Sequence, residues 1–185
     1  MVIRRAEWLD LGLVVVAAAG AGGLRVDRLA GELGVTKGSF YHHFVDLADY
    51  RRALLGHFEE RCTTRHIRAN ETLGDLAPRE RLLALADTVL ADERTHRGLE
   101  VGVRVWATQD DDARDTLERV DSRRLAYLEE LALALVDDAE RAVDLAGAIY
   151  YLLIGSQHAV PPGSTAQLRR LWQDLLLDAE RRAAR

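Results

Sequence analysis

The sequence contains a single cysteine and few aromatic residues, and each shortage narrows what the protein can be. One cysteine, Cys62, permits no disulfide within the chain. The aromatic content of 6% means that aliphatic side chains dominate any core, while the hydrophobic content of 48% argues against disorder. The most apolar run, residues 14–19, is far shorter than a membrane span. We therefore expect a globular, cytoplasmic protein with no membrane association.

The sequence also has no excess of basic residues. The formal net charge is −5, and residues 1–66 hold nine Lys and Arg against eight Asp and Glu, so the first third of the chain is close to neutral. Lys37 is the only lysine. Because such a chain has little overall attraction to a polyanion, any affinity for DNA must come from the local placement of basic side chains.

Patterns that would indicate an enzyme are absent from the sequence. No Ser/His/Asp or Cys/His/Asn arrangement stands in a nucleophile context, and the glycines at 20–23 lack the third glycine of a dinucleotide loop, since Arg25 stands there. Cys62 and His66, with Glu59 nearby, are an alternative metal site, and Cys62 is an alternative redox sensor, but neither pattern is specific. We expect no catalysis, no cofactor and no metal.

Apolar residues recur at helical spacing along the chain, and no segment alternates as a strand does. In the helix expected after a cap at Asp46, the spacing of four predicts an inner stripe of Tyr50, Leu54, Phe58 and Cys62. The sequence thus predicts an all-α fold of about nine helices, over residues 5–19, 26–33, 37–44, 47–67, 78–95, 99–108, 109–136, 140–158 and 165–182.

Residues 26–44 have the pattern of a DNA-binding helix-turn-helix. Gly34 stands where a helix end requires a positive φ, and Thr36 is a good cap for the next helix. Phe40 and Phe44 are four apart, which predicts that both face the core. The outward residues are small or donate hydrogen bonds, as contacts with phosphates and base edges require, and none between 33 and 45 is acidic.

The stretch Thr36–Phe44 closely resembles the recognition helix of the TetR family of bacterial transcriptional regulators. Leu29-Ala30, Gly34-Val35 and the glycines after residue 19 also stand where that family has them. The resemblance implies a three-helix DNA-binding head, residues 1–46, and a larger helical body, residues 47–185, for ligand binding and dimerisation. It implies a homodimer through the last two helices, and a repressor released from a palindromic operator on double-stranded DNA by a small-molecule inducer.

The resemblance also implies which residues contact DNA: Arg25, Thr36, Lys37, Gly38, Ser39, Tyr41, His42 and His43. For His43, packing beside Phe44 is an equal alternative. Two positions depart from the family. Arg25 replaces a frequent threonine, and Leu47 replaces a frequent lysine aimed at phosphate, so one phosphate contact is expected to be missing.

For the inducer, residues that combine size or polarity with inward positions are the candidates: Phe58, Cys62, Trp106, Tyr127, Tyr150 and Gln157. Ordinary core packing is the alternative for each of them. For the whole chain, the alternative function is a helical small-molecule-binding or protein-interaction module that has lost specific DNA binding. A third is an activator that uses the same DNA contacts.

Overall fold

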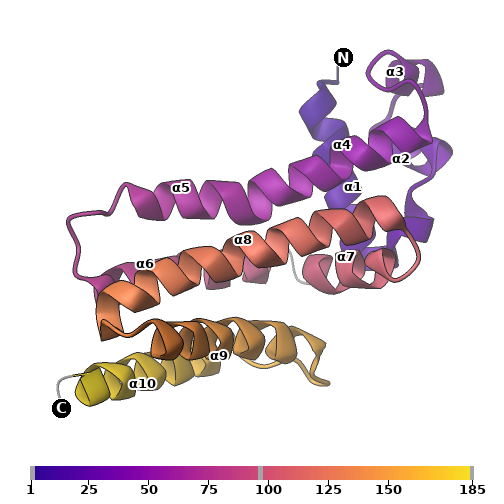
Figure 1. Cartoon of the computed structure of the whole chain (residues 1–185). Helices are drawn as coiled ribbons and strands as arrows, with labels where there is room; N and C mark the ends of the chain where they lie inside the picture. The colour runs from indigo at the N-terminus through magenta and orange to yellow at the C-terminus, as the bar shows by residue number, and fades with distance from the viewer. Residues whose placement is uncertain (1–2, 96–97, 184–185) are drawn as a thin grey trace. The chain divides into compact units, whose positions relative to one another are not determined.

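The computed structural model describes residues 3–95 and 98–183, and Figure 1 shows that they are helical. Because α4, η2 and α5 follow one another without a gap, they count as one helix. The described residues then form nine α-helices, as predicted, with the short 3-10 helix η1 in addition and no strand. None of these helices combines the length and apolar character needed to cross a membrane. The elements are α1 Arg5–Ala19, η1 Ala21–Gly23, α2 Val26–Glu32, α3 Lys37–Tyr41, α4 Leu47–Glu59, η2 Glu60–Thr64, α5 Arg65–Glu71, α6 Pro78–Thr95, α7 Leu99–Ala107, α8 Asp111–Val136, α9 Ala139–His158 and α10 Thr165–Ala183.

The chain divides into two compact units. Unit 1 consists of Met1–Arg61 and His96–Arg119, and unit 2 of Cys62–Thr95 and Val120–Arg185. α4 and α7 thus belong to the same unit as the first three helices. The boundary between residues 46 and 47 is a division of function, and it stays a prediction.

The core of unit 1 is built around four aromatic rings. Trp8 of α1, Phe40 of α3, Tyr50 of α4 and Phe44, which lies between α3 and α4, are each at most 2% exposed. The Phe40 ring centroid lies 5.4 Å from that of Trp8, 5.1 Å from that of Phe44 and 5.3 Å from that of Tyr50. The Tyr50 hydroxyl donates to the Trp8 carbonyl at 2.8 Å, and burial raises the pKa of this hydroxyl. Three helices are therefore joined through one cluster of rings.

Two glycines let helices of unit 1 approach closely. A Cβ on Gly12 of α1 would lie 2.1 Å from the Tyr50 hydroxyl oxygen, and a Cβ on Gly102 of α7 would lie 2.6 Å from the Val16 carbonyl oxygen. Gly12 is itself buried. Both contacts are shorter than any side chain tolerates, so these positions require glycine.

The predicted inner stripe of the long helix is wrong at Cys62. Tyr50, Leu54 and Phe58 are buried as expected, but Cys62 is half-buried and Thr63 is buried in its place. The reason is that η2 is a single π turn, in which hydrogen bonds join residues five apart and the inward position arrives one residue later. The spacing of four then resumes at Ile67, which is 7% exposed.

The polar groups that η2 turns inward are hydrogen-bonded within unit 2. Arg123 of α8 donates through Nη1 to the Thr64 hydroxyl at 2.8 Å. Arg124 donates through Nε to the Thr63 hydroxyl at 2.9 Å and through Nη2 to the Cys62 carbonyl at 3.2 Å. Two consecutive arginines therefore satisfy the threonines that replace apolar residues on the buried face.

The rest of the core of unit 2 is mainly aliphatic, with hydrogen-bonded polar groups inside it. α10 packs against α6 and α9. The Tyr127 hydroxyl donates to Asn70 Oδ1 at 2.8 Å and accepts from Arg81 Nη2 at 3.1 Å. The Tyr150 hydroxyl donates to Asp121 at 2.5 Å. The aliphatic residues include Leu82, Leu85, Leu90, Leu128, Leu131, Leu145, Ile149, Leu153, Leu168 and Leu176.

Candidate nucleic-acid interface

The turn between α2 and α3 has the geometry that the sequence predicts. Gly34 has a φ of 66°, the left-handed conformation that glycine adopts without strain. The Val35 amide donates to the Ala30 carbonyl at 3.0 Å, which closes the end of α2. Leu29 and Ala30 are buried at 0% and 3% exposure. A short side chain at Ala30 allows the two helices to lie close together.

α3 is shorter than predicted. It ends at Tyr41, and residues 42–43 form a turn, whereas the sequence pattern had extended the helix to Phe44. Thr36 stands at the cap position with an extended backbone, but its side chain makes no capping hydrogen bond. The Phe44 amide still donates to the Phe40 carbonyl at 3.0 Å. Both phenylalanines therefore remain inward, as predicted, although the helix between them is incomplete.

The face of α3 opposite the aromatic cluster is polar and accessible. Thr36, Lys37, Gly38 and His42 are exposed, Tyr41 is 57% exposed, and Ser39 is half-buried. Each exposed residue is small, basic or able to donate a hydrogen bond. The buried cluster of rings thus fixes the orientation of this face from behind.

Lys37 is not isolated on this face. Its ammonium forms an ion pair with the carboxylate of Asp27 on α2, and both side chains are more than half exposed. The hydrogen bond to Asp27 and the attraction of its charge raise the pKa of Lys37. The sequence did not indicate this contact, because the two residues are ten apart and on different helices.

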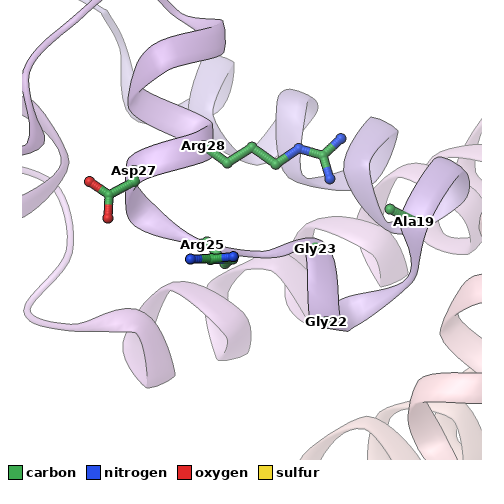
Figure 2. A pocket seen from close by; sticks show the side chains of 6 residues that line it. All are labelled: Ala19, Gly22, Gly23, Arg25, Asp27 and Arg28. Carbon is green, nitrogen blue, oxygen red and sulfur yellow. The ribbon is translucent and has the colours of Figure 1, made fainter.

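An open hollow of about 640 Å³ lies at the start of α2. Figure 2 shows Arg25 and Asp27 projecting from the first turn of α2, and Arg28 extending toward the Ala19 side. Arg28 also donates to Glu32 at 2.7 Å. Gly22 and Gly23 complete the lining and leave the backbone accessible. A phosphate group has the size and charge to approach Arg25 here.

His43, a predicted DNA contact, and Leu47, where a phosphate contact is expected to be missing, are both half-buried. His43 is half-buried, and its Nε2 lies 2.8 Å from the Ile3 carbonyl oxygen, which fits the packing alternative. Leu47 is half-buried at the start of α4, where Asp46 accepts a hydrogen bond from the Asp49 amide at 2.7 Å. The carboxylates that flank Leu47 therefore serve the helix start. A DNA contact by His43 stays a prediction.

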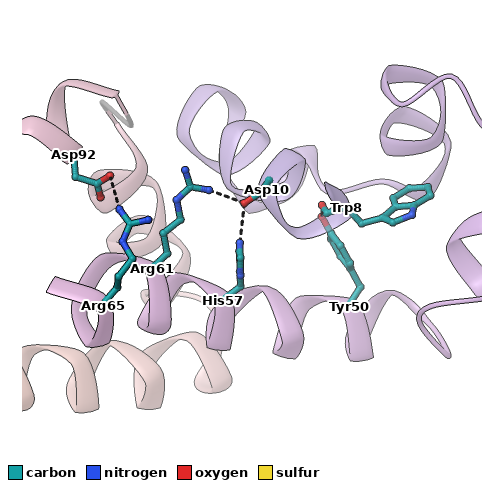
Figure 3. Close-up of polar contacts among 7 residues, drawn as sticks. All are labelled: Trp8, Asp10, Tyr50, His57, Arg61, Arg65 and Asp92. Carbon is teal, nitrogen blue, oxygen red and sulfur yellow. Dashed lines mark hydrogen bonds and ion pairs between the residues drawn. The ribbon is translucent and has the colours of Figure 1, made fainter. Parts of the chain in front are cut away.

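Polar contacts attach α4 to α1 within unit 1. Figure 3 shows Asp10 of α1 between His57 and Arg61, at 2.9 Å from His57 Nε2 and 2.6 Å from Arg61 Nη1. The hydrogen bond from Tyr50 to the Trp8 carbonyl lies further along the same pair of helices. α4 is thus held to α1 at both ends, and α1 holds α3 through Trp8 and Phe40.

No family model matches the chain, and a search of characterised proteins found no match. Solved structures do match. A transcriptional regulator from Saccharomonospora viridis in complex with choline is 20% identical, with a TM-score of 0.74 over 93% of this chain and 94% of its own. A TetR transcriptional regulator from Legionella pneumophila is 13% identical, with a TM-score of 0.73 over 100% and 97%. The regulatory protein TetR from Rhodobacter sphaeroides is 23% identical, with a TM-score of 0.70 over 96% and 95%.

The chain has the fold of TetR-family transcriptional regulators. The likeness covers nearly the whole of each chain, so it includes the helix-turn-helix and the helices that follow it. The TetR-family fold that the sequence resemblance implied is confirmed.

In this TetR-family fold, the six predicted ligand residues are divided between the units. Phe58 and Trp106 are buried in unit 1. Tyr127 and Tyr150 are buried in unit 2, where their hydroxyls already have the partners described above. Cys62 and Gln157 are half-buried there, and Gln157 Oε1 is buried with no hydrogen-bond partner among the described residues. A single pocket formed by these residues stays a prediction.

The alternative metal site at Cys62 and His66 has a different explanation in the structure. His66 is 5% exposed, and its Nε2 lies 3.3 Å from Asp92 Oδ2 on α6. Because Arg65 also lies near Asp92, at 3.9 Å, the carboxylate joins α5 to α6 (Figure 3). Among the residues that the structure describes, no group of three or more His, Cys, Asp or Glu side chains is arranged to hold a metal ion.

Proposed function

We propose that this chain is a TetR-family transcriptional regulator that binds double-stranded DNA through α3. The observation that carries the proposal is the two-sided character of α3. Its inner side is fixed by Phe40 in a buried cluster of rings, and its outer side presents accessible donors with no acidic residue of its own. A polar outer face is common to surface helices, but a face with basic and hydrogen-bond-donating side chains and no carboxylate suits a polyanion.

Within the proposed interface, the residues have different roles. Lys37 and Gly38 lie at the start of α3, the part of a recognition helix that reaches base edges, and the exposed Gly38 lets the backbone approach. Arg25 extends the interface to phosphate from the hollow at the start of α2. Thr36, Ser39, Tyr41 and His42 position the helix on the phosphate backbone.

The proposal includes a homodimer formed through α9 and α10. α9 is not buried on all sides, since Val143 is 52% and Tyr151 66% exposed. Gly147 lies between them at the same spacing of four, which gives a flat apolar strip, and Leu171 of α10 is 40% exposed. Exposed apolar strips of this kind mark protein interfaces. A two-fold dimer would present two copies of α3, so its operator would be approximately palindromic.

The proposal also includes release of DNA by a small molecule. The structure from Saccharomonospora viridis was solved with choline, so a chain of this fold binds a small molecule. Unit 2 has the paired polar groups within an aliphatic core that ligand sites use for orientation. We infer a repressor whose inducer is bound by residues among the six candidates named above.

The test is selection of duplexes from a random pool, followed by titration of the selected duplex with purified protein. We expect an approximately palindromic duplex, and binding to it that weakens strongly but stays measurable in Lys37→Ala. Arg114→Ala, which removes an exposed basic side chain that is likewise paired with one aspartate but lies on α8, is the matched control and should bind normally. Sedimentation of Tyr151→Glu would test the dimer, with a monomer expected.

Failure to enrich any duplex would favour the second candidate function, a helical small-molecule-binding or protein-interaction module without specific DNA binding. The near-neutral charge of residues 1–66 and the absence of a lysine at Leu47 favour that alternative. If a duplex is enriched, transcription measured with the operator upstream of a promoter separates a repressor from an activator.

A further inference from the structure

The ion pair between Asp27 and Lys37 has a different position from the other ion pairs of unit 1. Arg28 and Glu32 pair within α2, and Asp10 pairs with His57 of α4 and Arg61 of η2, away from α3. Only Asp27 reaches across the turn of the helix-turn-helix to a residue of α3, and that residue is the only lysine of the chain. The comparison of ion pairs covers residues 3–61 and 98–119, the part of unit 1 that the structure describes.

We propose that Asp27 is a specificity-determining residue for DNA, because it holds the Lys37 ammonium until a base edge replaces its carboxylate. This inference rests on the proposed function. In the absence of DNA, the Asp27 carboxylate is paired with the Lys37 ammonium. On DNA, Lys37 has to exchange the Asp27 carboxylate for a group on the duplex, and only some sequences offer it base acceptors in reach.

The physical argument concerns what non-specific DNA offers. Every duplex presents phosphates, so an unpaired lysine on α3 would strengthen binding to all sequences alike. A lysine that must leave a carboxylate gains little from a phosphate, because one charge pair replaces another. A guanine edge presents two acceptors, O6 and N7, in the major groove. When α3 is docked in the groove, these two acceptors can replace the Asp27 carboxylate as partners of the Lys37 ammonium.

The carboxylate also acts on phosphate directly. Asp27 lines the same hollow as Arg25 and Arg28. Figure 2 shows its carboxylate on the side of the helix away from the Arg28 guanidinium. A negative charge there repels a phosphate that approaches Arg25. This repulsion acts on the operator and on other sequences alike. Only the pairing with Lys37 therefore changes the ratio of specific to non-specific affinity, which determines occupancy of an operator in a genome.

The test compares Asp27→Asn with the wild-type chain on two duplexes, the selected operator and a scrambled duplex of the same length and composition. We expect Asp27→Asn to bind the scrambled duplex more tightly by up to about fivefold per subunit, the range set by exposed ion pairs. Binding to the operator should change less. The specificity ratio should therefore fall, as measured by fluorescence anisotropy at a fixed salt concentration.

Glu32→Gln is the matched control, because it removes the same charge from the same helix but releases Arg28 instead of Lys37. We expect it to strengthen both duplexes equally and to leave the ratio unchanged. A fall in the ratio of the same size as in Asp27→Asn would overturn the proposal, since any lost carboxylate would then suffice.

A double variant determines whether Asp27 acts through Lys37. If it does, adding Asp27→Asn to Lys37→Ala should leave the specificity ratio where Lys37→Ala alone puts it. A further fall would overturn the proposal. The two possible failures are distinguishable. If the wild-type chain binds no duplex specifically, the proposed function is refuted. If the wild-type chain binds its operator and Asp27→Asn has the same specificity ratio as the wild-type chain, only this inference is refuted. Circular dichroism before titration establishes that each variant is folded.

Discussion

The two compact units solve the problem of a stable interior in different ways. Unit 1 joins α1, α3 and α4 through four aromatic rings and allows no space at Gly12 or Gly102. Unit 2 has an aliphatic core that encloses several polar groups, each hydrogen-bonded to a neighbouring helix. Interlocked rings with one arrangement suit a platform that must hold α3 in a fixed orientation. Paired polar groups suit a region where a ligand's polar atoms compete for the same partners.

The largest effect is expected from a substitution that disrupts the cluster of four buried rings. Phe40→Ala removes a ring that contacts the three other rings of the buried cluster and the exposed ring of Tyr41. A cavity of this kind costs about 3–5 kcal/mol of the free energy of unfolding. Urea unfolding followed by circular dichroism measures it, and binding to the selected duplex should be lost as well. Val45→Ala, at a side chain that is 83% exposed, is the control and should change little. Equal effects of the two substitutions would show that α3 is not held by its inner side.

A smaller effect tests the tight approach of α1 to α4. Gly12→Ala places a methyl group against the Tyr50 hydroxyl, and overpacking of this kind costs about 1–3 kcal/mol. Thermal unfolding is the measurement. Gly31→Ala is the control, because nothing lies within 4 Å of its added Cβ and alanine is the better helix former. Adding Tyr50→Phe to Gly12→Ala should recover part of the loss, since the hydroxyl is the nearest obstacle. No recovery would contradict the assigned contact.

In unit 2, the comparison predicts sensitivity to a single hydroxyl. Tyr127→Phe keeps the ring but leaves Asn70, which is 3% exposed, without its donor, and an unsatisfied buried acceptor costs about 1–3 kcal/mol. Urea unfolding measures the loss. Tyr151→Phe, at a ring that is 66% exposed, should be close to neutral. If the two variants unfold alike, the polar groups of unit 2 contribute nothing to its stability.

The smallest expected effect depends on pH. Arg169 of α10 forms an ion pair with Asp87 of α6 and holds the pKa of that carboxyl below its ordinary value of 3.8. A lowered pKa means that the pair stabilises the fold above pH 3.8 and that this contribution is lost as the pH falls through the lower, folded-state value. Arg169→Met should therefore be slightly less stable than the wild-type chain at pH 7, and the difference should vanish in acid. A difference that persists below the folded-state pKa would exclude this origin.

The sequence predicted the helices and the turn because those depend on local signals. Gly34 adopts the positive φ expected of it, and Asp46 caps α4 as expected. Phe40 and Phe44 are buried as their spacing indicated. These features follow from glycine's conformational freedom, from side-chain capping and from helical periodicity, all of which act within a few residues.

The sequence could not predict features that depend on distant parts of the chain. The ion pair of Asp27 with Lys37 requires the path of the turn between their helices. The burial of Thr63 in place of Cys62 requires the π turn. The buried threonine hydroxyls in turn require hydrogen bonds from Arg123 and Arg124, which lie on the distant helix α8. The end of α3 at Tyr41 was missed because the spacing of Phe40 and Phe44 suits a single turn as well as a continuous helix.

The π turn of η2 also affects how this chain is aligned with others. Since its turn contains one residue more than an α-helical turn, a relative with an unbroken α-helix here has one residue fewer between the same two buried positions. A gapless alignment would match Cys62 with a residue that faces the core, and it would pair buried with exposed positions from there to the end of α5. One gap within Glu60–Thr64 restores the match at Thr63 and Ile67. One residue inserted within a helix can therefore hide the pattern of buried positions that two chains of the same fold share.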